Sequence, residues 1–145
     1  MKSLLTVTAL MELGAGLALL CCPSTSVRLL AGELLEAPAF LTVTRIGGAG
    51  LFSLGVASWF ARSDSRSRAA KGLIAAILLY NVAAVAILAE AILGFGLHGV
   101  LLWPGVVVHA SMTVWCILCL AQSTERTTGS PLASGISTPS TMNKE

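Results

Sequence analysis

Long apolar runs separated by short polar stretches make up the chain from about residue 4 to residue 121. A helix rises about 1.5 Å per residue, so a helix that crosses roughly 30 Å of hydrocarbon needs about 20 mostly apolar residues. Its backbone hydrogen bonds must also be satisfied within the segment. Four runs meet these conditions, at residues 4–22, 39–61, 72–94 and 97–121. The pattern predicts an all-α fold, a four-helix transmembrane bundle.

The segment between the first two spans has a different pattern. It begins with hydroxyl residues at 24–26, which favour a helix start, and Pro38 follows as a stop signal. Its apolar residues fall at helical spacing: Val27, Leu30, Leu34 and Leu35. We therefore expect a short interfacial amphipathic helix over residues 24–37, lying on the membrane surface.

The last part of the chain, residues 122–145, is rich in Ser, Thr, Gly and Pro and has almost no apolar residues to bury. Such a composition is typical of disorder. The sequence thus predicts one four-span domain over residues 1–121, followed by a disordered cytoplasmic tail over residues 122–145.

The first apolar run follows Lys2, which is also a feature of signal peptides. Glu12 interrupts the run, no small-x-small cleavage site follows it, and bulky Leu20 precedes Cys21 where a lipidated cysteine would need a small residue. These features favour retention of this run as the first membrane span.

Basic residues indicate how the spans are threaded, because short cytoplasmic loops are enriched in Lys and Arg. The opposite side of a four-span arrangement holds Arg28 and the uncharged turn "GFGLHG". The other basic residues that fix the orientation share one side: Lys2, Arg62, Arg66, Arg68, Lys71 and Arg126. We expect that side, with both termini, to be cytoplasmic and the helix over residues 24–37 to face outward.

Composition supports a lipid environment and excludes one class of partner. With 55% hydrophobic and 11% charged residues and a mean hydropathy of +0.85, a 145-residue chain cannot hide its apolar surface in a globule, so the lipid bilayer is its expected solvent. The net charge of +2 is small, and the basic residues form no patch with interleaved aromatic residues. This argues against nucleic-acid binding.

Four ionisable residues lie inside the predicted spans: Glu12, Arg45, Glu90 and His109. Each such group costs on the order of 3 kcal/mol in lipid, so it normally faces the bundle interior with a partner. Arg45 and Glu90 both lie near the outer ends of their spans, at matching depth. We predict that Arg45 pairs with Glu90 first and Glu12 second, with "GGAG" after Arg45 letting helices approach closely.

This intramembrane polar network has two interpretations. One is a structural ion pair that fixes the helix register. The other is a proton or anion site, with Glu12 or His109 as the titrating group and Arg45 as the fixed positive charge.

Secondary polar contacts are expected from three further residues. Tyr80 and Asn81 are placed to bridge helices, and Thr113 shares a helix face with His109. Asn81 points away from Glu90 on its helix, which favours a separate contact or a homo-oligomer interface.

The cysteines do not predict a metal centre. Cys116 and Cys119 in "CILC" have metal or redox spacing but lie in an apolar helix without further ligands, and Cys21 and Cys22 fall at the opposite membrane face. We interpret all four as packing thiols and expect no metal and no cofactor.

The layout resembles the DoxX-like group of small four-helix bacterial membrane proteins. The resembling stretches are "MELGAGLALLCCPS", an intervening outer segment, and "TRIGGAG" at the start of the second span, within residues 1–121. The resemblance implies a four-helix membrane bundle in the bacterial inner membrane, some of whose relatives accompany quinone-linked or thiol oxidoreductases. No catalytic residue carries over.

Three functions remain open at this point. The first is a non-enzymatic bundle that acts as a membrane partner or as a small-solute permeability factor. The second is an accessory subunit of a quinone-linked membrane oxidoreductase, with quinone near His109. The third is a proton-coupled transporter of a small solute that depends on Glu12. A chain of 14.9 kDa without a soluble domain favours action within a larger membrane complex or a homo-oligomer.

Overall fold

All the regular elements in the described part of the chain are helices. A computed structural model describes residues 1–33 and 37–128, with side chains up to Ser123. Its elements are α1 (Lys2–Cys21), α2 (Pro23–Ala31), α3 (Pro38–Ala61), the 3-10 turn η1 (Arg62–Asp64), α4 (Arg68–Leu93) and α5 (Leu102–Thr128). Four of these, α1, α3, α4 and α5, are long and apolar enough to cross a membrane. The predicted all-α class with four candidate spans is therefore confirmed.

The short helix between the first two spans is present but ends earlier than expected. Gly32 closes α2 with a left-handed backbone, φ 83°, and its N–H donates to the carbonyl of Arg28. This is a common glycine helix end, since glycine adopts positive φ without steric cost. Residues 34–36, which we expected to continue the helix, lie outside the described residues.

The fourth span also has different limits from those expected. Residues 94–101 form a glycine-rich connection in which Gly96 has φ 66°, and α5 begins only at Leu102. Pro104 then falls in the first turn, where no intrahelical N–H is required. At its other end α5 continues to Thr128, so the first residues of the expected tail are helical. The rest of the tail, residues 129–145, lies outside the described residues.

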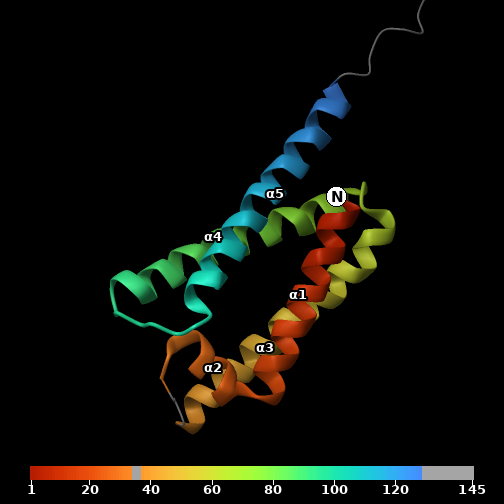
Figure 1. Cartoon of the computed structure of the whole chain (residues 1–145). Coiled ribbons are helices and arrows are strands. Elements are labelled where there is room, and N and C mark those ends of the chain that lie inside the picture. The colour runs from red at the N-terminus through yellow and green to blue at the C-terminus, as the bar shows by residue number, and fades with distance from the viewer. Residues whose placement is uncertain (34–36, 129–145) are drawn as a thin grey trace, which may run out of the picture.

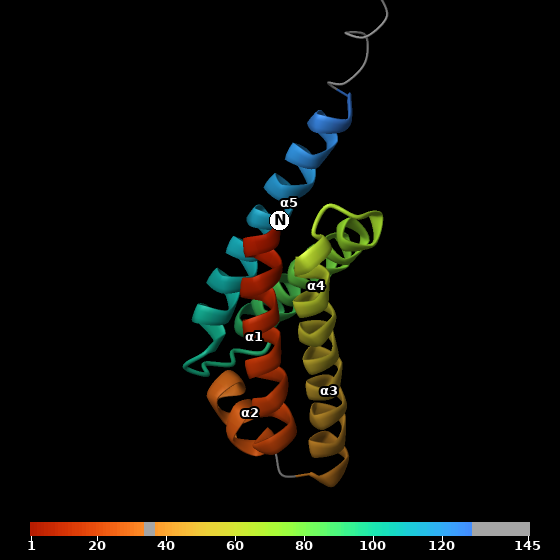
Figure 2. The ribbon, with the colours of Figure 1, turned by 90° about the vertical axis from the view of Figure 1, so that its right-hand side faces the viewer.

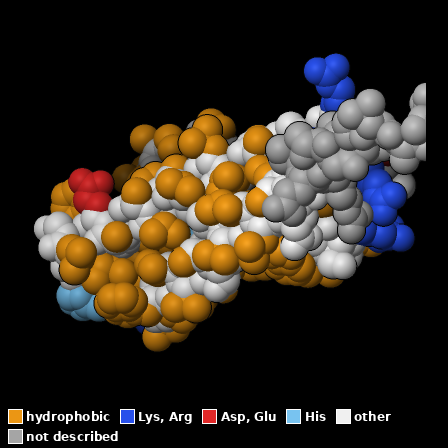
Figure 3. Space-filling view, turned by 90° about the horizontal axis from the view of Figure 1, so that it is seen from above, with side chains coloured by type: hydrophobic (Ala, Val, Ile, Leu, Met, Phe, Trp, Pro, Cys, Tyr) orange, Lys and Arg blue, Asp and Glu red, His pale blue; other side chains and the backbone are white. Residues whose placement is uncertain are grey.

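The long helices form two pairs. Helix α1 packs along α3, and α4 packs against α5 (Figures 1 and 2). The two pairs share a core at one end of the molecule, where the start of α1 meets the start of α4 and the later turns of α5. Its buried members are Leu4, Leu5, Ala70, Ile74, Ile77, Met112, Cys116 and Cys119. Away from this core, much of the apolar surface is exposed (Figure 3).

Glycines set the distance between α1 and α3. A Cβ added at Gly16 would lie 2.5 Å from the backbone nitrogen of Phe52 and 2.7 Å from the carbonyl oxygen of Gly48. At Gly55 an added Cβ would lie 2.8 Å from the backbone nitrogen of Leu13. Small residues of this kind let membrane helices approach until their backbones touch. Of the predicted "GGAG" stretch, Gly48 lies in this contact, whereas Gly47 and Gly50 face open space.

We expect Gly16→Ala to lower the stability of the protein by about 1–3 kcal/mol, because the new methyl group would meet backbone atoms that cannot turn away. Thermal unfolding of the purified protein in detergent, followed by circular dichroism, measures the effect. Gly14→Ala on the same helix is the matched control, since nothing lies within 4 Å of its Cβ position. Equal melting temperatures for the two variants would contradict the close backbone contact.

Candidate functional site

A cavity of about 530 Å³ separates the two helix pairs beyond their shared core. Its walls come from α1, α3, α4 and α5, and most of its lining is aliphatic. Four polar side chains reach it from four different helices: Glu12 from α1, Ser26 from α2, Tyr80 from α4 and His109 from α5. An apolar cavity of 300–1,000 Å³ with a few polar groups is the usual form of a small-molecule site.

Helix α2 closes one end of the cavity. Ser26, Leu29 and Leu30 contribute to its lining, together with Leu101 from the α4–α5 connection. The N–H of Leu101 donates to the carbonyl of Leu29 at 2.9 Å. A Cβ at Gly99 would overlap the carbonyl of Leu30, so this glycine allows the connection to lie directly on α2. Several lining residues are exposed, Ile87 and Leu101 among them, so the cavity also opens at the helix surface.

A hydrogen bond between α4 and α5 fixes the orientation of His109. Asn81 is 2% exposed; its Nδ2 donates to the carbonyl of Ile77 at 2.8 Å, and its Oδ1 lies 2.8 Å from Nδ1 of His109. The Ile77 carbonyl only accepts, so the Asn81 nitrogen must face it and the Asn81 oxygen must face His109. Because that oxygen also only accepts, Nδ1–H of His109 is the donor. In the neutral ring Nε2 is then a hydrogen-bond acceptor.

Tyr80 supports the same imidazole from a second direction. The rings of Tyr80 and His109 meet edge to face, with centroids 5.6 Å apart. This arrangement is favourable for aromatic pairs. The Tyr80 hydroxyl adds a group at the cavity that both donates and accepts hydrogen bonds.

Glu12 is the acidic group of the cavity. It is 7% exposed and lies one residue before Leu13, at the level of Gly55 in the α1–α3 contact. Within the described residues its carboxyl group has no hydrogen bond and no ion pair. Its oxygens accept hydrogen bonds in either protonation state. A buried carboxyl without a protein partner is costly in lipid, which makes Glu12 a candidate functional residue.

The structure does not bring Arg45 to either acid, which corrects the predicted ion pair. Arg45 is exposed on α3 and makes no ion pair with any described residue. It lies ten residues before Gly55 (55 − 45 = 10), and hence roughly 15 Å along the helix axis from the level of Glu12. A long guanidinium side chain that is exposed near the start of a helix needs no buried acid as a partner.

Glu90 is likewise exposed and unpaired within the described part of the chain. Helices α3 and α4 diverge from η1, so that the start of α3 at Pro38 lies far from the end of α4 at Leu93 (Figure 1). Equal depth therefore did not imply contact. Of the four predicted network residues, Glu12 and His109 share the cavity, whereas Arg45 and Glu90 do not line it.

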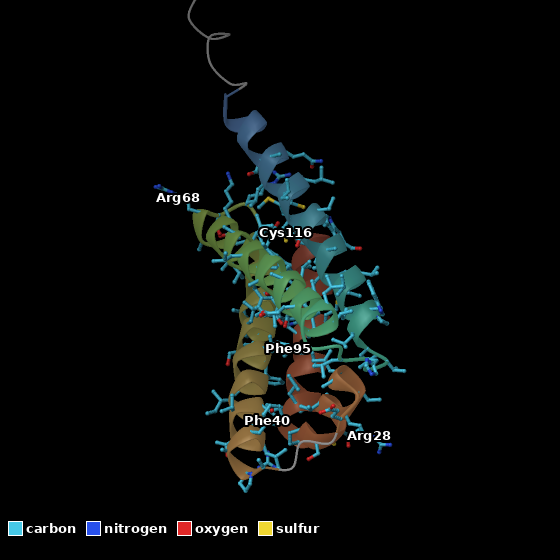
Figure 4. The ribbon with its side chains drawn as sticks, turned by 90° about the vertical axis from the view of Figure 1, so that its left-hand side faces the viewer. Arg28, Phe40, Arg68, Phe95 and Cys116 are labelled. Carbon is cyan, nitrogen blue, oxygen red and sulfur yellow. The ribbon has the colours of Figure 1, made fainter. Side chains whose placement is uncertain are left out.

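Of the secondary contacts, Tyr80 and Asn81 both meet His109, whereas the Thr113 hydroxyl donates within its own helix, to the carbonyl of His109 at 2.8 Å. Cys116 and Cys119 are buried in the shared core, and Cys21 and Cys22 are exposed (Figure 4 labels Cys116). Across residues 1–33 and 37–128, no group of three or more His, Cys, Asp or Glu side chains is placed to hold a metal ion.

Sequence reasoning missed the contribution of α2 to the cavity. The amphipathic pattern of residues 24–37 predicted a helix with an apolar face but not what that face covers. Two sequence features could have indicated this contact. Gly32 ends α2 early, and the glycines of the α4–α5 connection, Gly99 above all, let that connection lie directly on α2.

No protein-family model, curated protein or solved structure matches this chain.

We expect Asn81→Leu to destabilise the α4–α5 pair by roughly 1 kcal/mol, the size of an interhelical hydrogen bond in a membrane protein. The variant leaves Nδ1–H of His109 without its acceptor. Thermal unfolding in detergent measures the loss. Ser111→Ala is the control, because the exposed Ser111 hydroxyl donates only to the carbonyl of Val107 on its own helix. Unchanged stability of Asn81→Leu beside that control would show that the contact does not hold the helices together.

Proposed function

We propose that the protein is a non-enzymatic integral membrane bundle that binds a small lipophilic molecule with a hydroxyl-bearing head group in the cavity between its helix pairs. The observation that carries the proposal is the convergence of Glu12, Tyr80 and His109 on a mostly apolar cavity of about 530 Å³. The aliphatic walls accommodate a lipophilic body, and the polar groups select the head.

The hydrogen-bonding pattern favours a head group that donates. His109 offers Nε2 as an acceptor, because Asn81 already takes the proton on Nδ1. The oxygens of Glu12 are acceptors without a protein donor among the described residues. A ligand with two hydroxyl groups, such as a quinol, satisfies both, while its ring lies against the aliphatic walls. Such a ligand also agrees with the alternative role of an accessory subunit of a quinone-linked oxidoreductase, which the DoxX-like resemblance implies.

The proposal includes a membrane orientation. Four candidate spans, with basic residues gathered at the end of the molecule that holds the start of α4, agree with a cytoplasmic position for that end. Arg68 and Arg28 lie at opposite ends of the molecule (Figure 4). In this orientation, in a bacterial inner membrane, both termini are cytoplasmic and α2 lies at the outer interface, where it covers one end of the cavity.

Exposed apolar side chains support the further proposal that the bundle works beside a membrane partner. Leu79 and Ile87 on α4 are 71% and 64% exposed, and Val107 and Leu118 on α5 are 62% and 53% exposed. Lipid or another membrane helix can cover such a surface, since the two are equally apolar. A larger complex or a homo-oligomer therefore remains part of the proposal.

We expect decyl-ubiquinol to bind the purified protein in lipid nanodiscs, and the oxidised decyl-ubiquinone to bind at least fivefold more weakly because it lacks hydroxyl donors. Anaerobic titration calorimetry measures both affinities. Glu12→Leu should weaken quinol binding roughly tenfold, because it removes an acceptor while keeping the side chain bulk. Glu90→Leu is the matched control, since that acid is exposed and lies outside the cavity.

A cavity-filling pair separates this site from nonspecific partition into lipid. Ala84→Trp places an indole in the cavity, whereas Ala76→Trp adds the same group to an exposed position of α4 that does not line it. Binding should be lost in the first variant and kept in the second. Equal binding in both, or no quinol binding above that of empty nanodiscs, would refute the proposed site.

Proton-coupled movement of a solute is a second candidate function, and it rests on the unpaired Glu12 carboxyl at the open cavity. In liposomes loaded with a pH-sensitive dye, we expect an imposed membrane potential to drive proton uptake that is abolished by Glu12→Gln. Glu90→Gln should leave the rate unchanged. Uptake no faster than in protein-free liposomes, or insensitive to Glu12→Gln, would exclude this function.

A further inference from the structure

A second pocket, of about 420 Å³, lies at the other end of the molecule and contains none of the cavity residues. Three parts of the chain meet there: the start of α1, the connection from η1 to α4 with the first turn of α4, and the last apolar turns of α5. The lining residues are Met1, Lys2, Ser65, Arg66, Lys71, Cys119, Gln122 and Ser123.

Three cationic side chains line this pocket, which we call the basic pocket: Lys2 on α1, Arg66 before α4 and Lys71 on α4. Among the side chains that the structure describes, the lining holds no acidic residue, and none of the three cations has an ion pair. Like charges held around one pocket repel each other, and a shared anion removes that repulsion. The hydroxyl of Ser65 and the amide of Gln122 add neutral donors for anionic oxygens.

Not every cation at this end of the molecule belongs to the pocket. Arg62 lies over the ring of Trp59, with its guanidinium carbon 3.4 Å from the ring centroid, and therefore already has a partner. Arg68, labelled in Figure 4, is exposed and does not line the pocket. On the face shown in Figure 3, Lys and Arg side chains gather at the end away from the Glu and His side chains. The three lining cations are thus a localised group within a generally basic end.

The pocket lies where the apolar part of α5 ends. Cys119 at its base belongs to the buried apolar core, and Gln122 and Ser123 lie at the end of the candidate span Leu102–Ser123. One turn below Gln122, Leu118 is 53% exposed on α5. An anion held by the three cations therefore sits directly above apolar helix surface.

We infer that this basic pocket binds the phosphate of an anionic phospholipid headgroup, with the acyl chains lying along the exposed apolar surface of α5. The ligand chemistry is a phosphodiester monoanion, which Lys and Arg recognise by charge-assisted hydrogen bonds. A phospholipid is favoured over free phosphate because the pocket adjoins the hydrocarbon region, where basic pockets between membrane helices take lipid headgroups.

The test compares lipid retention by the full chain and its variants. Protein is reconstituted in mixed nanodiscs of phosphatidylcholine and phosphatidylglycerol and re-extracted in mild detergent, and the co-purified lipids are quantified by mass spectrometry. We expect phosphatidylglycerol to be enriched over phosphatidylcholine. The double variant Arg66→Gln/Lys71→Gln should lose enrichment by roughly fivefold for each charge removed.

The matched control is Arg62→Gln/Arg68→Gln, which removes the same charge from the same end of the molecule but from outside the pocket. It should change enrichment by less than twofold. Lys71→Arg keeps the charge and should keep the enrichment. Both double variants should retain the wild-type circular dichroism spectrum, so that loss of lipid is separated from loss of fold. Equal loss of enrichment in the two double variants would overturn the inference, because it would show only diffuse attraction.

A second arm distinguishes the source of the phosphate. Inorganic phosphate and glycerol 3-phosphate, each at millimolar concentration, are added during re-extraction at constant ionic strength. The inferred lipid site predicts that neither displaces phosphatidylglycerol, since neither provides acyl contacts. Displacement by inorganic phosphate would overturn the assignment to a lipid in favour of a soluble phosphate ligand.

Discussion

The backbone contact between α1 and α3 determines where the polar groups of this protein lie. Gly16, Gly48 and Gly55 bring the two helices together until no Cβ fits between them, which fixes their axial register. That register sets Glu12 at the level of Gly55 and Arg45 ten residues nearer the start of α3. The same contact therefore keeps the buried acid and the exposed arginine apart, and leaves the acid to face the cavity.

The two ends of the molecule have different chemistry because the helix pairs meet at only one of them. Near the starts of α1 and α4, aliphatic side chains and two cysteines fill the space between the pairs, and basic residues surround the ends of the helices. Farther along, the pairs separate and α2 covers the opening, so a cavity with Glu12, Tyr80 and His109 remains. A lipophilic ligand and an anionic headgroup would thus occupy separate places in one bundle.

For the polar residues, the sequence pattern predicted positions along the helices but not the contacts between them. Depth along a span follows from counting residues, so Arg45, near the start of α3, and Glu90, near the end of α4, were expected at matching depth. Contact also depends on helix rotation and on which helices are neighbours, and neither follows from depth. Asn81 was placed correctly on the face away from Glu90, but that its partner is His109 followed only from the packing of α4 on α5.

The sequence alone determined the helical class, the four candidate spans and the segregation of basic residues, because these depend on local composition and on the length of hydrocarbon to be crossed. Only the tertiary structure decided which helices pair, at which end of the molecule the two pairs share a core and which side chains line the same cavity. Those outcomes depend on contacts between residues far apart in the chain, and in lipid such contacts are selected by shape and hydrogen bonding instead of by hydrophobicity.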